Sequence, residues 1–170
     1  VDADLIVTIG GASVGDHDLV KPALRTLGLG LAVETVAVRP GKPTWFGLLP
    51  PQGQDGGRRV LGLPGNPASA LVCAELFLRP LLAALTGGDG EVRLVPARLA
   101  TPLPASGPRE HWMRARLTFA GGGATVRPYG APASSLVRVF AASNALLRRV
   151  AGAEAAAAGS VVEVLPLARA

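Results

Sequence analysis

The sequence predicts an α/β domain over residues 1–88, followed by a small β-rich domain over residues 89–170. Three observations lead to this fold class. Residues 5–9 (LIVTI) form a continuous apolar run, as expected for a strand buried on both faces. Leucines recur at helical spacing after Pro67. Beyond Gly88 the chain consists of short β-like runs that glycine and proline interrupt, which is typical of a small β domain.

The α/β part should begin on the strand at residues 5–9. Because this strand is apolar on both faces, we expect it to be central, with a neighbouring strand on each side. A helix should follow at 19–27 and end at Gly28, which acts as its C-cap. The remaining expected elements are strands at 32–38, 44–49 and 60–63, and a polar turn at 50–57.

The longest helix should start where Asn66 and Pro67 follow the strand at 60–63. Asparagine is a good N-cap and proline a good first helical residue. Pro80 should kink or split this helix because it lacks an N–H, and glycines at 87 and 88 should end it. Cys73 lies among apolar helical neighbours and is expected in the core.

In the β-rich part, strands are expected at 92–99, 111–119, 125–129, 146–150 and 161–165. One or two helical turns are expected within 134–144, and the alanine-rich stretch 155–158 should be a surface loop. The second domain is therefore expected to consist mainly of short strands.

The net charge of +5 lies entirely in the second part of the chain. Residues 1–87 hold seven acidic and seven basic side chains, whereas residues 88–170 hold five and ten. This excess indicates either an anionic partner or a solvated basic surface. Aromatic residues make up 4% of the chain, which disfavours binding of nucleic acid by base stacking.

Composition excludes several other classes. A single cysteine, Cys73, excludes an intrachain disulfide and a cysteine-based zinc site, and two histidines far apart in sequence disfavour structural zinc. No apolar run looks long enough to span a bilayer. The N-terminus has no start methionine and no signal-peptide pattern, and it begins almost directly on a strand, which predicts a fragment of a longer protein.

Fifteen of the seventeen basic residues are arginine, so the two lysines stand out. Lysine provides a compact point charge that suits a phosphate or another oxyanion. Lys21 follows the glycine-rich loop GGASVGDHD, and Lys42 lies in the irregular segment RPGKP. Both positions favour a role with an anionic ligand, although two lysines are also compatible with chance.

Unusual loops follow three of the expected strands, at GGASVGDHD, RPGKP and PGNPAS. Ligands of open parallel sheets bind beyond the carboxyl ends of the strands, so we expect these loops to share a pocket. Gly10 and Gly11 can adopt positive φ and allow a close approach to the backbone. Ser13 offers a hydroxyl group, while Asp16 and Asp18 can hold a hard cation through oxygen.

The other two loops add groups that suit an anion. Arg39 and Lys42 can neutralise an oxyanion, and Ser69 adds a hydroxyl. Asn66 opens a helix whose free N–H groups and dipole favour negative charge. Each feature also has a purely structural interpretation: a turn for the glycines, dipole complementation for the two aspartates, and an ordinary cap for Asn66. Their joint placement favours a phosphorylated ligand with a divalent metal.

Taken in order, the three loops resemble those of the molybdopterin molybdenumtransferase family, which includes the C-terminal domain of gephyrin. That family carries GGxSxGDxDxxK, a PGKP loop and LPGNPxSA; residues 10–21, 39–43 and 63–70 match these patterns. GGxSxGD alone also occurs in smaller molybdopterin-binding proteins such as adenylyltransferases. The other two motifs and the β-rich tail favour the molybdenumtransferases, and the resemblance covers nearly the whole chain.

The resemblance implies the C-terminal part of a three-layer α/β molybdopterin-binding domain, followed by a small barrel-like domain. It implies an enzyme of molybdenum cofactor biosynthesis that inserts molybdate into adenylylated molybdopterin and releases AMP, with Mg²⁺ or a similar divalent cation. It also implies a cytoplasmic homodimer that acts on small anionic substrates and binds neither nucleic acid nor membrane. The alternatives are a non-catalytic molybdopterin-binding module and a gephyrin-like scaffold.

By resemblance, Asp16, Asp18 and Lys42 would be catalytic, and the two aspartates would also bind the metal. The residues that would bind molybdate or the pterin phosphate are Gly10, Gly11, Ser13, Lys21, Arg39, Lys42, Gly65, Asn66 and Ser69. The family often has a Gln-Gly-Ser stretch in its last domain where this chain has residues 132–134, so Arg114 and Ser134 are weaker candidates there. Without the upstream half of the family, the fragment alone is expected to be inactive.

Overall fold

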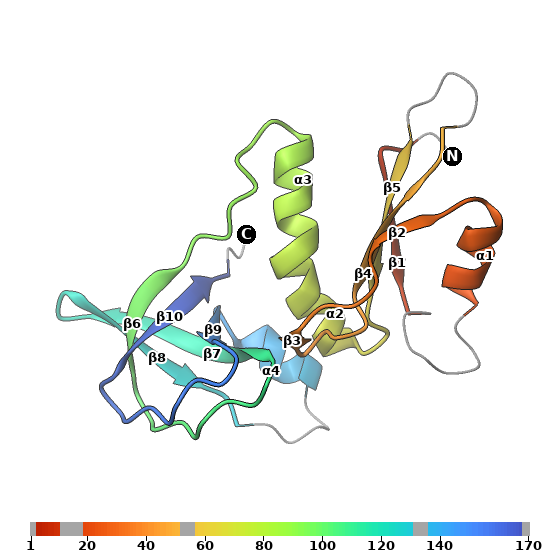
Figure 1. Cartoon of the computed structure of the whole chain (residues 1–170). Helices are drawn as coiled ribbons and strands as arrows, with labels where there is room; N and C mark the ends of the chain where they lie inside the picture. Colours follow the sequence, from red (N-terminus) through yellow and green to blue (C-terminus); the bar gives the residue numbers. More distant parts are fainter. Residues whose placement is uncertain (1–2, 11–18, 52–56, 131–135, 168–170) are drawn as a thin grey trace. The chain divides into compact units, whose positions relative to one another are not determined.

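The structure is a computed structural model that describes residues 3–10, 19–51, 57–130 and 136–167 (Figure 1). The chain forms two compact units. The first unit comprises Val1–Ala37 and Gly41–Ala74, and the second comprises Val38–Pro40 and Glu75–Ala170. The second unit thus takes a short segment from within the sequence of the first. The sequence-based domain boundary at residue 88 stays a prediction.

The first unit is built on a four-stranded sheet in the order β1-β5-β4-β2 (Figure 1). Its strands are β1 (Leu5–Ile9), β2 (Gly30–Val33), β4 (Trp45–Leu49) and β5 (Arg58–Leu63). β1 runs parallel to β5, whereas the β5–β4 and β4–β2 pairs are antiparallel. Among the described residues β1 pairs with β5 alone, so the expected second neighbour of β1 is not found there.

Helix α1 (Val20–Thr26) packs on one face of this sheet. Leu24 of the helix contacts the buried cluster that includes Trp45 and Val60. Gly28 adopts φ +89° just after the helix, and its N–H donates to the carbonyl of Arg25 at 3.0 Å. The expected glycine stop is therefore confirmed, because a left-handed residue at this position closes the last turn.

The prediction of one strand over residues 32–38 is wrong. β2 ends at Val33, and the following segment bends so that the N–H of Val36 donates to the carbonyl of Lys42 at 3.1 Å. That hydrogen bond closes a loop and takes Val36 out of any strand ladder. The next strand, β3 (Val38–Arg39), joins the sheet of the second unit. β-branched residues alone could not reveal this break, because it depends on a contact with a later residue.

A helical run follows β5 as predicted, with Asn66 as N-cap and Pro67 at its start. It consists of α2 (Pro67–Cys73), a π-helical segment (Ala74–Leu78) and α3 (Arg79–Leu85). Pro80 does not split the run. Proline lacks an N–H, and its ring would collide with the carbonyl four residues earlier in a regular α-helix. The wider π turns just before α3 accommodate it.

This run also has the dimensions of a membrane span, contrary to the expectation from sequence. Pro67–Leu85 comprises 19 residues, and its best window has a mean hydropathy of 1.7 with 28% of that window buried. Core helices of soluble proteins have similar dimensions, and this run carries an ion pair between Arg79 and Glu75 at 3.2 Å. Length and composition therefore give weak support for a membrane segment.

The second unit is a small closed barrel (Figure 1). Its sheet has the order β3-β7-β8-β6-β10-β9, and a further pairing of β7 with β9 closes it. β3 joins the start of β7 in parallel, with Arg39 opposite His111. The other elements are β6 (Val95–Leu99), β7 (Glu110–Ala120), β8 (Gly123–Pro128), α4 (Leu136–Ala142), β9 (Ala145–Arg149) and β10 (Val161–Pro166). The barrel-like domain is confirmed.

Alternate residues of these strands fill the barrel. On β7, Ala115 and Leu117 are buried, whereas Arg116 between them is exposed. The stretch 155–158 is not entirely a surface loop, since Ala156 exchanges hydrogen bonds with Leu103 and packs against the core. The period-two alternation therefore separates the barrel interior from a polar outer surface.

We predict that Gly62→Ala destabilises the protein by about 1–3 kcal/mol, the usual range for an overpacked core. The Trp45 ring lies over Gly62, and a Cβ atom there would be 2.0 Å from ring atoms. Urea denaturation of the full-length protein would measure the loss. Gly107→Ala serves as control, because a Cβ at Gly107 has no atom within 4 Å. Equal stability of both variants would contradict the packing described here.

Candidate functional site

The carboxyl ends of β1 and β5 bring two of the predicted loops together. The last parallel pair is Ile9 with Leu63, and the N–H of Gly10 donates to the carbonyl of Leu63 at 3.2 Å. A Cβ atom on Gly65 would be 3.3 Å from the Cα of Gly10. Gly10 itself has φ +85°. The two glycines therefore let the loops GGASVGDHD and PGNPAS start side by side, with a backbone that a ligand can approach closely.

The loop PGNPAS begins α2 with a hydrogen-bonded cap. The side-chain oxygen of Asn66 accepts from the N–H of Ser69 at 3.1 Å and from its hydroxyl at 3.3 Å. The expectation that N–H groups here are free for a ligand is thus wrong for Ser69, because the cap already satisfies this donor. Ser69 is half-buried at the first turn, and its hydroxyl oxygen keeps its capacity to accept a hydrogen bond.

Residues 41–43, the part of the RPGKP loop that belongs to the first unit, lie at the same edge of the first sheet, for a different reason than expected. They precede β4, and β4 is antiparallel to β5, with Trp45 opposite Gly62 near the carboxyl end of β5. The start of an antiparallel strand and the end of its partner share one edge. Lys42 is exposed in this loop, three residues before Trp45. The edge thus carries Lys42 together with the Gly10 and Gly65 loops.

Thr44 fastens this loop to helix α2. Its side chain is buried, and its hydroxyl hydrogen-bonds to the carbonyl of Gly41 at 2.8 Å and the sulfur of Cys73 at 3.2 Å. Cys73 is fully buried, as expected for a core residue. Burial raises the pKa of the Cys73 thiol, and the hydrogen bond with Thr44 opposes that rise. The cysteine therefore acts as a neutral packing residue that positions the Lys42 loop.

Several predicted residues have a different status. Lys21 is half-buried as the second residue of α1. Gly11, Ser13, Asp16, Asp18 and Ser134 lie outside the described residues. In the described part of the chain no three histidine, cysteine or acidic residues form a cluster that could hold a metal ion. The proposed metal ligands are not among those residues, so the magnesium site stays a prediction.

Arg39 belongs to the second unit, where it forms a basic neighbourhood with Arg114. Both arginines act on His111, which pairs with Arg39 across β3 and β7. Burial lowers the pKa of His111, and the charges of Arg39, Arg109 and Arg114 lower it further. Burial also lowers the pKa of Arg114. The positive potential suits an anion, and burial together with this potential favours the neutral form of His111.

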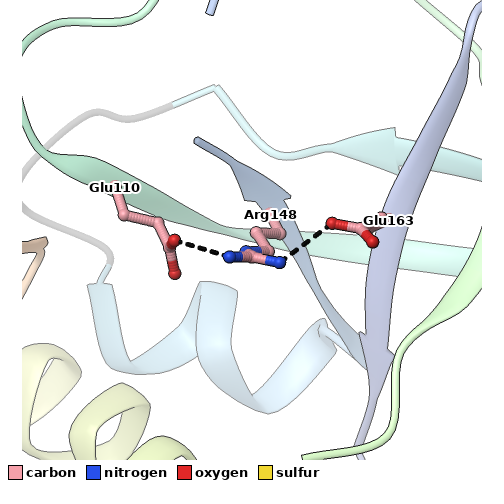
Figure 2. Close-up of polar contacts among 3 residues, drawn as sticks. All are labelled: Glu110, Arg148 and Glu163. Carbon is pink, nitrogen blue, oxygen red and sulfur yellow. Dashed lines mark hydrogen bonds and ion pairs between the residues drawn. The ribbon is translucent and has the colours of Figure 1, made fainter. Parts of the chain in front are cut away.

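Other charged residues of the barrel serve its structure. Arg148 lies between two carboxylates and bonds to Glu110 at 2.9 Å and Glu163 at 3.0 Å (Figure 2). Its guanidinium also lies 5.9 Å from the centre of the Trp112 ring. A cavity of about 250 Å³ adjoins Trp112 and Arg148, and none of the predicted site residues lines it. The opposite charges thus hold β7, β9 and β10 together.

No role was predicted for Asn144, whose side chain fastens the segment after α4 to β7. Its side chain accepts from the N–H of Leu117 at 2.7 Å and donates to the carbonyl of Leu117 at 2.9 Å. Asn144 follows Ser143, whose hydroxyl donates to the carbonyl of Val139 at 2.6 Å and ends α4.

Family models match both parts of the chain. Residues 1–84 match the model described as "Probable molybdopterin binding domain", and residues 96–167 match "MoeA C-terminal region (domain IV)". The two matches follow the change in fold from the α/β unit to the barrel.

Curated relatives and solved structures agree with these models. Molybdopterin molybdenumtransferase 2 of Mycobacterium tuberculosis is 36% identical over 98% of this chain and 41% of its own length. Molybdopterin molybdenumtransferase of Staphylococcus aureus (strain COL) is 28% identical over 95% and 38%. The structure of the molybdopterin biosynthesis moeA protein from Pyrococcus horikosii matches with a TM-score of 0.76 at 27% identity, over 99% of this chain and 38% of that one. The chain therefore spans about two fifths of the length of these relatives.

We predict that Thr44→Val lowers the free energy of unfolding by about 1–2 kcal/mol, because the buried hydroxyl loses its hydrogen bonds to Gly41 and Cys73. Thr44→Ser keeps the hydroxyl and should lose less than Thr44→Val. Urea denaturation at a constant m-value would measure the difference in full-length protein. A valine variant as stable as wild type would show that these hydrogen bonds do not hold the loop.

Proposed function

The chain belongs to the molybdopterin molybdenumtransferase family, and we propose that it forms the C-terminal part of an enzyme that inserts molybdate into adenylylated molybdopterin and releases AMP. The observation that carries this proposal is the junction of Gly10 with Gly65 at the carboxyl ends of β1 and β5. This junction joins two of the three loops that match the family motifs. Lys42 at the same edge adds a cation that suits a dianionic substrate.

The residues divide by the chemistry that they can supply. Gly10, Gly11 and Gly65 would admit the substrate close to the backbone, and Asn66 would hold the α2 cap. Lys42, Ser13 and Ser69 would bind molybdate or the pterin phosphate, with Lys21 adding positive charge. Transfer from a phosphoanhydride builds negative charge, so a fixed cation such as Lys42 would stabilise the transition state more than the ground state.

The second unit would add Arg39 and Arg114, with Ser134 as a further candidate. Their contribution would be a positive potential that favours binding of an oxyanion. Burial lowers the pKa of His111, and the charges of Arg39 and Arg114 lower it further.

Asp16 and Asp18 would hold Mg²⁺ or a similar cation, because carboxylate oxygens are the ligands that magnesium prefers. The metal would supply charge neutralisation at the phosphate oxygens of the substrate. We further propose that the full-length protein is a cytoplasmic homodimer that binds neither membrane nor nucleic acid. The low aromatic content, 4% of the chain, supports the proposal that the protein does not bind nucleic acid.

The activity can be tested by incubating the full-length protein with adenylylated molybdopterin, molybdate and Mg²⁺. We expect AMP release that depends on molybdate. Binding of the pterin without AMP release would favour a molybdopterin-binding module, and neither binding nor release would favour a scaffold. Residues 1–170 assayed alone should show no turnover, and comparable rates for the piece and the full-length protein would contradict that expectation.

We predict that Lys42→Ala in the full-length enzyme lowers kcat/KM for molybdate by an amount equivalent to about 1.5–3 kcal/mol, the usual value of a hydrogen bond to a charged group. Because Lys42 is exposed, its removal should change folding stability by less than about 0.5 kcal/mol. Steady-state assays with varied molybdate, together with thermal unfolding, would measure both quantities.

Arg25→Ala is a suitable control, since it removes one exposed cation from the same unit, where Arg25 pairs with Glu34 at 3.5 Å. The control variant should keep the molybdate dependence of wild type. If Lys42→Ala shows that same dependence too, Lys42 does not bind the oxyanion.

A further inference from the structure

Two arginines face each other on the outer surface of the barrel. Arg116 on β7 is directly opposite Arg127 on β8, and both side chains are exposed. Like charges at directly opposed positions destabilise a sheet. One strand further, Arg98 on β6 is opposite Thr125, which lies two residues before Arg127 on β8. Cross-strand pairing within the sheet therefore does not explain why these three cations lie on one outer face.

Among the described residues, no ion pair links these three arginines to a carboxylate. The two acidic residues on the barrel strands, Glu110 and Glu163, both bond to Arg148. Arg98 donates to the carbonyl of Gly159 at 3.3 Å, which leaves its charge unneutralised. The positive charge of this surface is therefore available to an anion.

The surface is continuous with Arg114. Arg114 and Arg116 are two residues apart on β7, so both side chains point to the outer face. The N–H of Tyr129 donates to the carbonyl of Arg114 at 2.9 Å, which extends the contact of β7 with the end of β8 to this residue. Together, Arg98, Arg127, Arg116 and Arg114 form an arginine strip along the barrel. The charge of Arg114, at the end of this strip, acts on His111, which pairs with Arg39.

We propose that the arginine strip collects the anionic substrate of this enzyme and raises its concentration beside Arg114. The inference rests on the proposed function and adds to it a surface of weak, exchangeable binding. Its ligand is a dianionic oxyanion, which could be molybdate itself or the phosphate of the pterin. Exposed arginines hold such groups through two parallel N–H donors. Since the charges are exposed, binding is weak and strongly screened by salt.

The test uses the full-length enzyme and the double variant Arg116→Gln/Arg127→Gln. At low ionic strength we expect kcat/KM for the collected substrate to fall about 3–10-fold while kcat changes less than about twofold, in line with electrostatic focusing. At high ionic strength the two enzymes should become equal. Varying molybdate at saturating pterin, and pterin at saturating molybdate, identifies which anion the strip collects.

Arg79→Gln/Arg93→Gln is the matched control. It removes the same charge from the same unit, but these arginines already pair with Glu75 and Asp89. This control should keep the kcat/KM and the salt dependence of wild type. Thermal unfolding adds a second check. The Arg116→Gln/Arg127→Gln variant should be at least as stable as wild type, because the substitutions remove the repulsion between two like charges.

Equilibrium dialysis against molybdate alone, and against inorganic phosphate alone, makes the result independent of turnover. At low ionic strength the Arg116→Gln/Arg127→Gln variant should bind at most about half as much of the anion as wild type, since two of the three exposed arginines of the strip are lost. If the wild-type protein binds the anion but releases no AMP, the proposed function is refuted and the proposal of the arginine strip still holds. Equal anion binding by both proteins, or equal kcat/KM and salt dependence in both arms, would overturn the strip.

Discussion

Strand β5 is the element on which the candidate site depends. It pairs in parallel with β1 on one side and in antiparallel with β4 on the other, so the end of β1, the end of β5 and the start of β4 share one edge. Gly62 makes this arrangement possible, since it leaves space for the Trp45 ring directly over the strand. A side chain there would push β4 away and move the Lys42 loop from the edge. Core packing and site geometry thus rest on the same contact.

The barrel separates an apolar interior from a charged surface. Alternating alanine, leucine and valine side chains fill the interior, while the outer positions carry most of the excess positive charge. Arg148 is neutralised between Glu110 and Glu163, so it stabilises strands and contributes little to the external potential (Figure 2). Arg116 and Arg127 have no such partners among the described residues, and their charge extends into solvent. Arginine therefore has two distinct roles within one small domain.

Local sequence signals predicted most of the regular elements, because their causes are local. Gly28, Asn66 and Pro67 act within one helical turn, and the helix boundaries near them were predicted correctly. The error at residues 32–38 arose because a hydrogen bond between Val36 and Lys42 decides where β2 ends. The Lys42 loop was expected at the correct edge but after a parallel strand, since strand direction is set by pairing and leaves no mark on a single strand. The contacts of Asn144 with Leu117 were missed for the same reason: they join residues 27 positions apart.

The discontinuous second unit has a consequence for where the chain can be divided. β3 lies in the sequence between two segments of the first unit, yet it pairs with the first residues of β7. A single cut near residue 75 or 88 would therefore yield a barrel without β3. The start of β7 would then lose its parallel partner and offer unsatisfied backbone groups to other chains. The barrel keeps a complete sheet only when β3, which carries Arg39, stays attached. Inheritance of the two units as separate modules would therefore require this strand to be duplicated or replaced.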